Sequence, residues 1–281
     1  MKIRPKSIGI VGLGQIGGSI GLALRKRAPE LRLVGVEPNE ARAEKAGSFL
    51  DAVSPRFDVF SGVDWIVLAV PVRTILALMP ELFARFPRAV FLDTGSTKQK
   101  IVARARKLGP DFRFVGGHPM AGSEKGGEAG WNPNLFQEKP FFLAEVWPDA
   151  ELNQAAEQFV TLLGAQPVWV EPAVHDQRLA YSSHFAYLLS ALYLLQGESR
   201  GHLRADFLGS GFASVARLAG SSPEMALDML LTNRENVLGE VRAFKKALNS
   251  VEEWLEKDEA EDLKKWLGRS EALWKEMGSL D

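Results

Sequence analysis

The chain contains no cysteine, which excludes disulfides, thiolate metal sites and cysteine nucleophiles. It also lacks an excess of either charge. The formal net charge is -1 over 281 residues, so no general basic field is present to recruit nucleic acid or an anionic membrane. With only four histidines, we expect no metal site. The composition, 46% hydrophobic and 25% charged residues, is that of an ordinary globular protein.

Long hydrophobic runs are also missing. The longest apolar stretch, residues 185–195, is too short to span a bilayer and predicts a buried helix. Three basic residues near the N-terminus precede an apolar stretch, but that stretch leads at once into a glycine-rich motif and a helical pattern, unlike an export signal. We therefore expect a cytoplasmic protein with no membrane partner.

The first part of the chain alternates short β-branched runs with helical patterns. Strands are predicted at 7–11, 31–36, 65–70 and 89–93, with helices at 15–27 and 39–46 and after the last two strands. Segments 113–117, 141–144 and 167–170 could extend the sheet. Continuous apolar strands between helices indicate an α/β fold with a doubly wound parallel sheet of the Rossmann type.

After about residue 171 the strand-like runs give way to helical periodicity. Ser222 followed by Pro223 is typical of a helix start, and residues 250–253 have the spacing of a capping box. We therefore predict two domains, a dinucleotide-binding domain over 1–170 and an all-helical domain over 171–281.

A glycine-rich motif directly follows the first predicted strand and opens the first helix. It comprises Gly12, Leu13, Gly14, Gln15, Ile16 and Gly17. The first glycine permits a tight turn, the second lets the backbone approach a pyrophosphate, and the third allows close helix–strand packing. Glu37 ends the second strand, where a carboxylate can bind both ribose hydroxyls and repel a 2′-phosphate. This favours NAD, although Arg42 in the next helix could reach toward the phosphate of NADP.

Two polar groups follow neighbouring strands. Ser96 comes just after the strand at 89–93, and His118 ends the segment that follows. Carboxyl ends of parallel strands meet at one edge, where such folds bind ligands. The serine could orient the imidazole, and a neutral imidazole suits an alcohol proton near pH 7. By itself, a histidine at a strand end is more often structural than catalytic. His184 and Arg217 are the further candidates, from the helical part.

Several ordered segments together resemble the prephenate/arogenate dehydrogenase family. They are GLGQIGGS at 12–19, AVPV at 69–72, DTGSTK at 93–98, HPMAGSEK at 118–125 with LF at 135–136, HD at 175–176, SH at 183–184, GF at 211–212, RLA at 217–219, SP at 222–223 and Asn233. The long block that starts at His118 is the most specific of these, and the resemblance covers most of the chain.

The resemblance implies NAD-dependent oxidative decarboxylation of prephenate to 4-hydroxyphenylpyruvate, in tyrosine biosynthesis. His118 would take the proton of the ring hydroxyl and Ser96 would bind near it. Arg217 would bind a substrate carboxylate, for which its planar charged fork is suited, and His184 would help to form the substrate pocket. The resemblance also places Val70 and Pro71 at the cofactor and predicts a homodimer through the helical domain.

The chain departs from the family pattern at two places in the helical part. Ala213 and Ser214 stand where relatives carry an Arg-Asp pair, and Tyr187 stands where many carry a second histidine. Both changes bear on substrate preference more than on reaction class. In the loop after His118, Glu124 and Lys125 could either order the loop or contact the cofactor.

Other functions stay open at this point. Arogenate differs from prephenate only in its side chain, and no residue in the sequence decides between the two. A β-hydroxyacid or imine dehydrogenase shares the general layout but has no need of the block at 118–125. A catalytically silent NAD-sensing protein would be expected to lack His118, Ser96 or Arg217, and all three are present.

Overall fold

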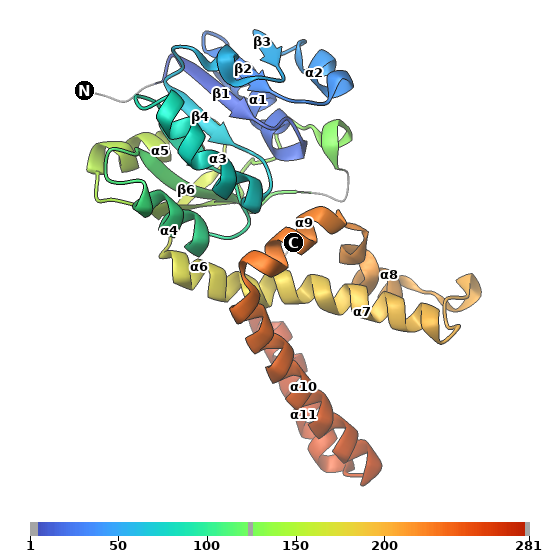
Figure 1. The fold of residues 1–281 in the computed structure, drawn as a ribbon. Helices are drawn as coiled ribbons and strands as arrows, with labels where there is room; N and C mark the ends of the chain where they lie inside the picture. The colour runs from blue at the N-terminus through green and yellow to red at the C-terminus, as the bar shows by residue number, and fades with distance from the viewer. Residues whose placement is uncertain (1–4, 123–125, 279–281) are drawn as a thin grey trace. The chain divides into compact units, whose positions relative to one another are not determined.

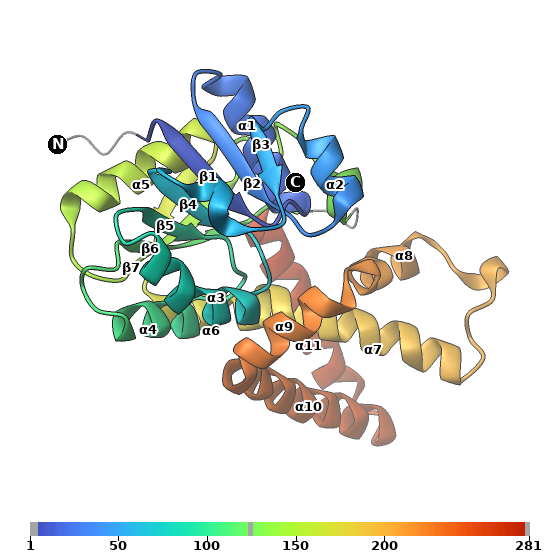
Figure 2. The same ribbon diagram turned by 45° about the horizontal axis from the view of Figure 1, so that its top comes forward.

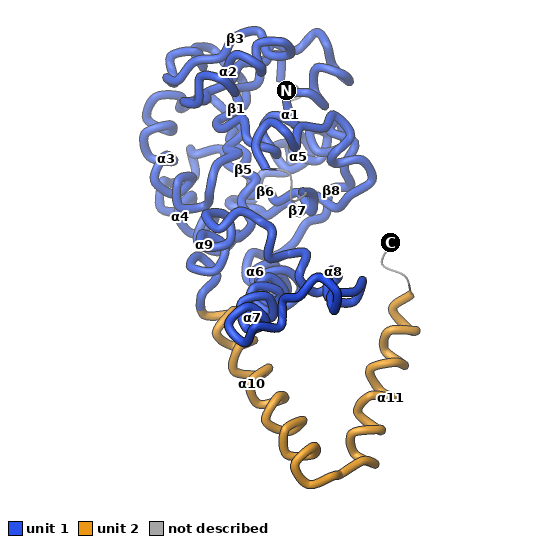
Figure 3. Tube along the Cα trace, turned by 90° about the vertical axis from the view of Figure 1, so that its right-hand side faces the viewer, with its two compact units in different colours: residues 1–234 blue, residues 235–281 orange. Residues whose placement is uncertain are grey.

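The computed structural model describes residues 5–122 and 126–278. The chain divides into two compact units, residues 1–234 and residues 235–281 (Figure 3). The domain boundary predicted near residue 171 falls inside the first unit and stays a prediction.

The first unit is built around an eight-stranded sheet of order β3-β2-β1-β4-β5-β6-β7-β8 (Figure 1). The strands are β1 (Ser7–Val11), β2 (Arg32–Val36), β3 (Ala52–Ser54), β4 (Trp65–Leu68), β5 (Val90–Asp93), β6 (Phe114–Pro119), β7 (Pro140–Glu145) and β8 (Gln166–Trp169). Strand order reverses at β1 and β4, as in a doubly wound Rossmann fold. The predicted fold class is therefore confirmed.

The far edge of the sheet differs from the prediction. Strand β7 pairs antiparallel with β6, and β8 runs parallel to β7, so the last two strands run against the other six. A parallel return needs a crossover, usually an α-helix, whereas the described part of the β6–β7 connection contains only the short 3-10 helix η2 (Gly127–Gly130). Strand β3, whose three residues are half-buried, was not predicted from the sequence.

Helices cover both faces of the sheet (Figures 1 and 2). One core packs α1 (Gln15–Arg27) and α5 (Ala150–Leu162) against the strands, and Trp65 stacks on Phe159 at 5.4 Å. The other core packs α3 (Val72–Arg85) and α4 (Gln99–Lys107) against the opposite face. The short helix α2 (Glu40–Ala46) follows β2, and the 3-10 helix η1 (Phe57–Phe60) follows β3. Burial on both faces explains the continuous apolar strands.

The rest of the first unit is helical. Its elements are α6 (Pro172–Leu179), the π-helical turn η3 (Ala180–Phe185), α7 (Ala186–Ser199), η4 (Ala205–Phe207), α8 (Ser210–Ala216), η5 (Arg217–Gly220) and α9 (Pro223–Thr232). The predicted start of α9 is confirmed, because the Ser222 hydroxyl accepts a hydrogen bond from Met225 N.

The apolar helix predicted to be buried is only partly buried in the single chain. Residues 185–195 lie mostly in α7, where Ser190 is the buried residue, and Leu192, Tyr193 and Leu195 are each about half exposed. Across residues 5–122 and 126–278, no helix is long and apolar enough to cross a membrane.

The second unit consists of most of α10 (Arg234–Glu256) and of α11 (Ala260–Met277), whose Trp254 and Trp266 rings lie 6.3 Å apart. The helix start predicted at Ser250 is wrong. Ser250 lies inside α10, and its hydroxyl donates to the Lys246 carbonyl. The helical repeat continues through the capping-box spacing, and the helix ends only before Asp258, which has φ 55°. A local cap pattern does not stop a helix whose periodicity continues.

We expect Gly17→Ala to destabilise the first unit, because a Cβ at this position would overlap the Gly12 carbonyl oxygen. The cost should be about 1–3 kcal/mol, the usual range for overpacking, and thermal unfolding measures it. Gly14→Ala is the matched control, because a Cβ there would have no described atom within 4 Å apart from those of the adjoining chain. Equal melting temperatures for the two variants would contradict the packing argument.

Candidate active site

The glycine-rich loop between β1 and α1 has the shape that a dinucleotide needs. Gly12 has φ 83°, and a Cβ there would lie 2.5 Å from Val70 Cγ1. The loop therefore packs against the end of β4, where Val70 leads into Pro71, the N-cap of α3. Gly14 faces open space before Gln15, at the N-terminus of α1. A glycine cradle with free space at a helix N-terminus fits a pyrophosphate.

A buried carboxylate, that of Glu37, holds the glycine-rich loop in place. Glu37, only 4% exposed, accepts hydrogen bonds from Leu13 N at 2.9 Å and from Asn39 N at 3.0 Å. Arg42 Nη1 lies 3.2 Å from the same carboxylate. Two of the positions predicted to bind cofactor, Leu13 and Glu37, are thus directly bonded to each other. Ile16, another of these positions, is half-buried and packs against the core.

The segment from residue 126 to Trp131 covers this loop. Trp131 Nε1 lies 3.0 Å from the carbonyl oxygens of both Leu13 and Gly14, to which it donates. The ring packs edge-on against Phe49 at 5.2 Å, over Gly18, where any side chain would overlap the indole. The sequence motif contained Gly18 but not its partner, so this contact was missed. Glu124 and Lys125 lie outside the described residues.

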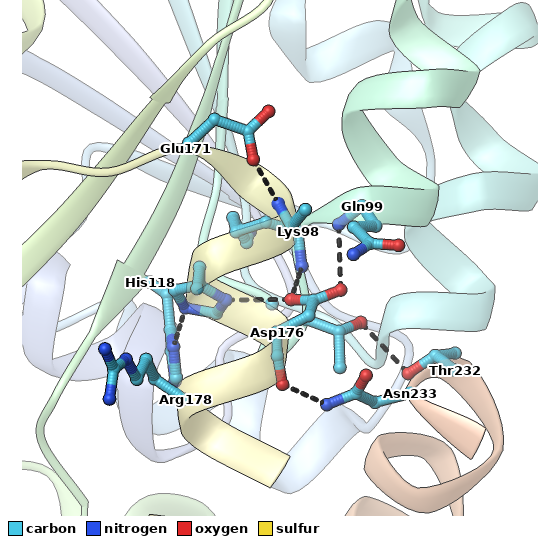
Figure 4. A network of polar contacts seen from close by, with 12 residues as sticks. Lys98, Gln99, His118, Glu171, Asp176, Arg178, Thr232 and Asn233 are labelled. Carbon is cyan, nitrogen blue, oxygen red and sulfur yellow. Dashed lines mark hydrogen bonds and ion pairs between the residues drawn. The ribbon is translucent and has the colours of Figure 1, made fainter. Parts of the chain in front are cut away.

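His118 stands at the end of β6 and is held by a residue of α6 (Figure 4). Its Nδ1 lies 2.9 Å from His175 Nε2, and His175 Nδ1 lies 2.8 Å from Asp176 Oδ1. Because an ionised carboxylate only accepts, His175 Nδ1 carries the proton and its Nε2 accepts from His118 Nδ1–H. His118 Nε2 is then left with a free lone pair, as a general base requires.

The orientation of His118 was predicted from Ser96, but the structure shows another partner. His175 takes the Nδ1 contact, and within the described chain Ser96 makes no hydrogen bond to His118. The HD pair at 175–176 was visible in the sequence as part of the family pattern, with no role given to it. The predicted contact of Ser96 with substrate stays a prediction.

Electrostatics keep His118 neutral. Burial lowers its pKa well below the usual 6.5, and the neighbouring His175 and Lys98 lower it further. Lys98 is itself buried, where it pairs with Asp93 and donates to the Gly117 carbonyl. Burial lowers the pKa of Lys98 and raises that of Asp93, while their pairing opposes both effects. The pair ties the end of β5 to β6 beside His118.

His184 lies in the π-helical turn η3 and is fully buried. Its Nδ1 lies 3.1 Å from Asn233 Nδ2, which also donates to the Asp176 carbonyl at 2.6 Å. His184 Nε2 is buried without hydrogen-bond geometry to any described atom, although the Ser96 carbonyl is near enough to favour the protonated ring. His118, His175 and His184 thus lie around α6 and the β5–α4 loop. His118 and His184 were predicted site residues, whereas the place of His175 in the site was found only in the structure.

Arg217 is not part of this cluster of histidines. It is exposed at the start of η5 and makes no ion pair among the described residues. The turn is held to α7 by Ala219 N, which donates to Ser190 Oγ at 3.0 Å. Of the positions that depart from the family pattern, Ala213 and Ser214 are exposed on α8, and Tyr187 is half-buried on α7.

The doubly wound sheet, the glycine cradle and a neutral histidine at the same edge are the features of a dinucleotide-binding oxidoreductase. Residues 20–168 match the family model described as prephenate dehydrogenase, nucleotide-binding domain, and residues 171–269 match the one described as prephenate dehydrogenase, dimerization domain. The chain belongs to the prephenate dehydrogenase family.

Individual relatives agree with this assignment. The chain is 35% identical over 267 residues to the prephenate dehydrogenase of Bacillus subtilis (strain 168), covering 90% of this chain and 71% of that protein. Prephenate dehydrogenase from A. aeolicus, solved in complex with hydroxyphenyl propionate and NAD+, has a TM-score of 0.86 at 28% identity, covering 96% of this chain and 98% of that one. Synechocystis arogenate dehydrogenase has a TM-score of 0.78 at 28% identity, covering 95% and 98%.

The buried state of His184 predicts a dependence of stability on pH. Burial lowers its pKa to about 4, against the opposing effect of Asp176. The unfolded chain, with a pKa near 6.5, binds the proton more tightly. The stabilisation is therefore complete above about pH 6.5 and is lost as the pH falls to about 4, at a cost of about 3 kcal/mol.

Denaturant unfolding between pH 4 and pH 7 measures this effect. His118 adds to the wild-type slope, because its pKa is also lowered. The difference between wild type and His184→Asn therefore isolates His184, and the exposed His202→Asn serves as control. The argument fails if His184→Asn keeps the full wild-type slope.

Proposed function

We propose that this chain oxidises prephenate with NAD, releasing carbon dioxide and giving 4-hydroxyphenylpyruvate for tyrosine biosynthesis. The observation that carries the proposal is the hydrogen-bond chain from Asp176 through His175 to His118, which leaves His118 Nε2 as a proton acceptor. This acceptor lies at the sheet edge that also carries the glycine cradle. A cytoplasmic location, and a boundary near residue 171 between nucleotide-binding and helical parts, belong to the same proposal.

In the proposed reaction His118 takes the proton of the ring hydroxyl. NAD, which the loop at 12–17 with Val70 and Pro71 would hold, would supply the acceptor for the hydride that leaves the hydroxyl-bearing carbon. The ring then loses carbon dioxide, and the proton returns to the oxygen of the aromatic product. Ser96 and His184 contact the substrate beside His118, and Arg217 binds a substrate carboxylate. Loss of carbon dioxide makes the ring aromatic, so the protein mainly has to align base, hydride donor and carboxylate.

The preference for NAD rests on Glu37. Its two oxygens each accept one backbone N–H, and a carboxylate has further lone pairs for the ribose hydroxyls. A buried negative charge at the end of β2 disfavours the additional phosphate of NADP.

His118→Asn should abolish turnover and leave NAD binding intact. Loss of a general base typically costs 10²–10⁴-fold in rate. The absorbance of reduced nicotinamide, followed with prephenate and separately with arogenate, measures activity and substrate branch, and calorimetry measures NAD binding. His202→Asn, an exposed histidine, is the matched control. Folded wild-type protein that binds NAD yet oxidises neither substrate would refute the proposed function.

We also propose that the chain forms a homodimer through its helical part. The exposed apolar side chains of α7, Leu192, Tyr193 and Leu195, are about half exposed in the single chain. Large apolar side chains exposed close together on one helix are typical of an interaction site. The match to a dimerization domain over residues 171–269 supports a second copy as the partner.

Leu195→Asp should weaken this dimer, because it would bury an unpaired carboxylate in the interface. Light scattering coupled to size exclusion, over a range of protein concentrations, measures the mass. Ser199→Asp adds the same charge at the exposed end of α7 and should leave the dimer unchanged. A monomeric wild-type protein, or a Leu195→Asp variant that dimerises like wild type, would disprove this interface.

A further inference from the structure

Two cations of α2 lie at the corner of the nucleotide site. Arg42 and Lys45 follow the end of β2, where a Rossmann fold places the adenosine ribose. In folds that take NADP, an arginine near this corner accommodates the 2′-phosphate. Judged by position alone, Arg42 suits the 2′-phosphate of NADP, whereas the neighbouring Glu37 suits the ribose of NAD.

Both cations are held by one carboxylate from a distant part of the chain. Glu128 of η2 accepts from Arg42 Nε at 3.3 Å and from Lys45 Nζ at 3.1 Å. Arg42 also pairs with Glu37 at 3.2 Å, so its guanidinium lies between two carboxylates. The backbone of Glu128 itself, then Lys45 and Arg42, lower the pKa of Glu128 to about 2, so the group is ionised near neutral pH.

Glu128 is fixed in relation to the cofactor loop. It lies three residues before Trp131, which donates to the Leu13 and Gly14 carbonyls. Gln15 Nε2 also contacts the Gly130 carbonyl at 3.5 Å. The segment that leaves the strand of His118 therefore brings a negative charge to the ribose corner.

We propose that Glu128 is a specificity-determining residue that disfavours NADP. Two carboxylates balance two cations at this corner, so the 2′-phosphate meets no surplus positive charge. Without Glu128, Arg42 keeps one carboxylate partner and Lys45 has none among the ion pairs described here, and both can turn toward a phosphate. The inference rests on the proposed function, whose preference for NAD it deepens. If Glu128 only tethered its segment to α2, removing its charge would affect NAD and NADP alike.

The test compares the binding of the two dinucleotides to Glu128→Gln, by calorimetry without substrate. We expect the NADP dissociation constant to fall about five- to tenfold, as expected for one charge contact near a protein surface, while that for NAD changes less than about twofold. Glu44→Gln is the matched control. It removes the same charge from an exposed position of α2, where the described residues show no ion pair between Glu44 and Arg42. The double variant Glu128→Gln/Arg42→Gln should lose the gain.

Equal shifts for NAD and NADP in Glu128→Gln would overturn the proposal, as would the same gain in Glu44→Gln or its survival in the double variant. A wild-type protein that binds neither dinucleotide would overturn both this inference and the proposed function. Binding with the expected pattern in a protein that does not oxidise prephenate would contradict the proposed function alone.

Discussion

The Asp176 carboxylate is the contact on which the geometry of the site depends. It accepts from Lys98 N at 2.6 Å and from Gln99 N at 2.9 Å, and so caps α4 from outside its own sequence. It also accepts from His175 Nδ1, which sets the tautomer of His118. One buried side chain thereby joins α6 to the sheet edge and decides which nitrogen of the base is free. If this carboxylate were lost, two amides at the start of α4 and the ring N–H of His175 would lose their acceptor.

Burial sets the protonation states of the histidines in the site and also makes their charged forms unfavourable. The same exclusion of water that lowers the pKa of His118, and so keeps it a neutral acceptor, destabilises the protonated form of His184. Lys98 and Asp93 are tolerated in this interior because they pair with each other and bond to neighbouring backbone. The site is therefore built from polar groups that satisfy one another, except that His184 Nε2 has no hydrogen-bond partner within the part of the chain that the structure describes.

Polar groups beside the glycine-rich loop also pair with one another, but some of their contacts are weaker and more exposed. Glu37 is buried and bonded to the cofactor loop, whereas the Arg42–Glu128 pair is about a third exposed. Ion pairs of this kind contribute little to stability. We propose that they act instead on the charge that a ligand meets at this corner, and so on the choice between NAD and NADP. Trp131 supplies the rigid part of this arrangement by bonding the covering segment to the loop beneath it.

The sequence alone determined the Rossmann class of fold, the strands β1, β2, β4 and β5, the glycine-rich loop, the position of His118 at a strand end and the family, because these depend on local periodicity and short motifs. It failed where distant segments meet. Three features exist only once the chain has folded. They are the direction of β7 and β8, the His118–His175 contact across 57 residues and the Arg42–Glu128 pair across 86 residues. The cap predicted at Ser250 failed for a related reason, since continued helical packing overrides a local pattern. Local signals specify elements and their order, whereas the partner of a polar side chain is decided by which elements the tertiary structure brings together.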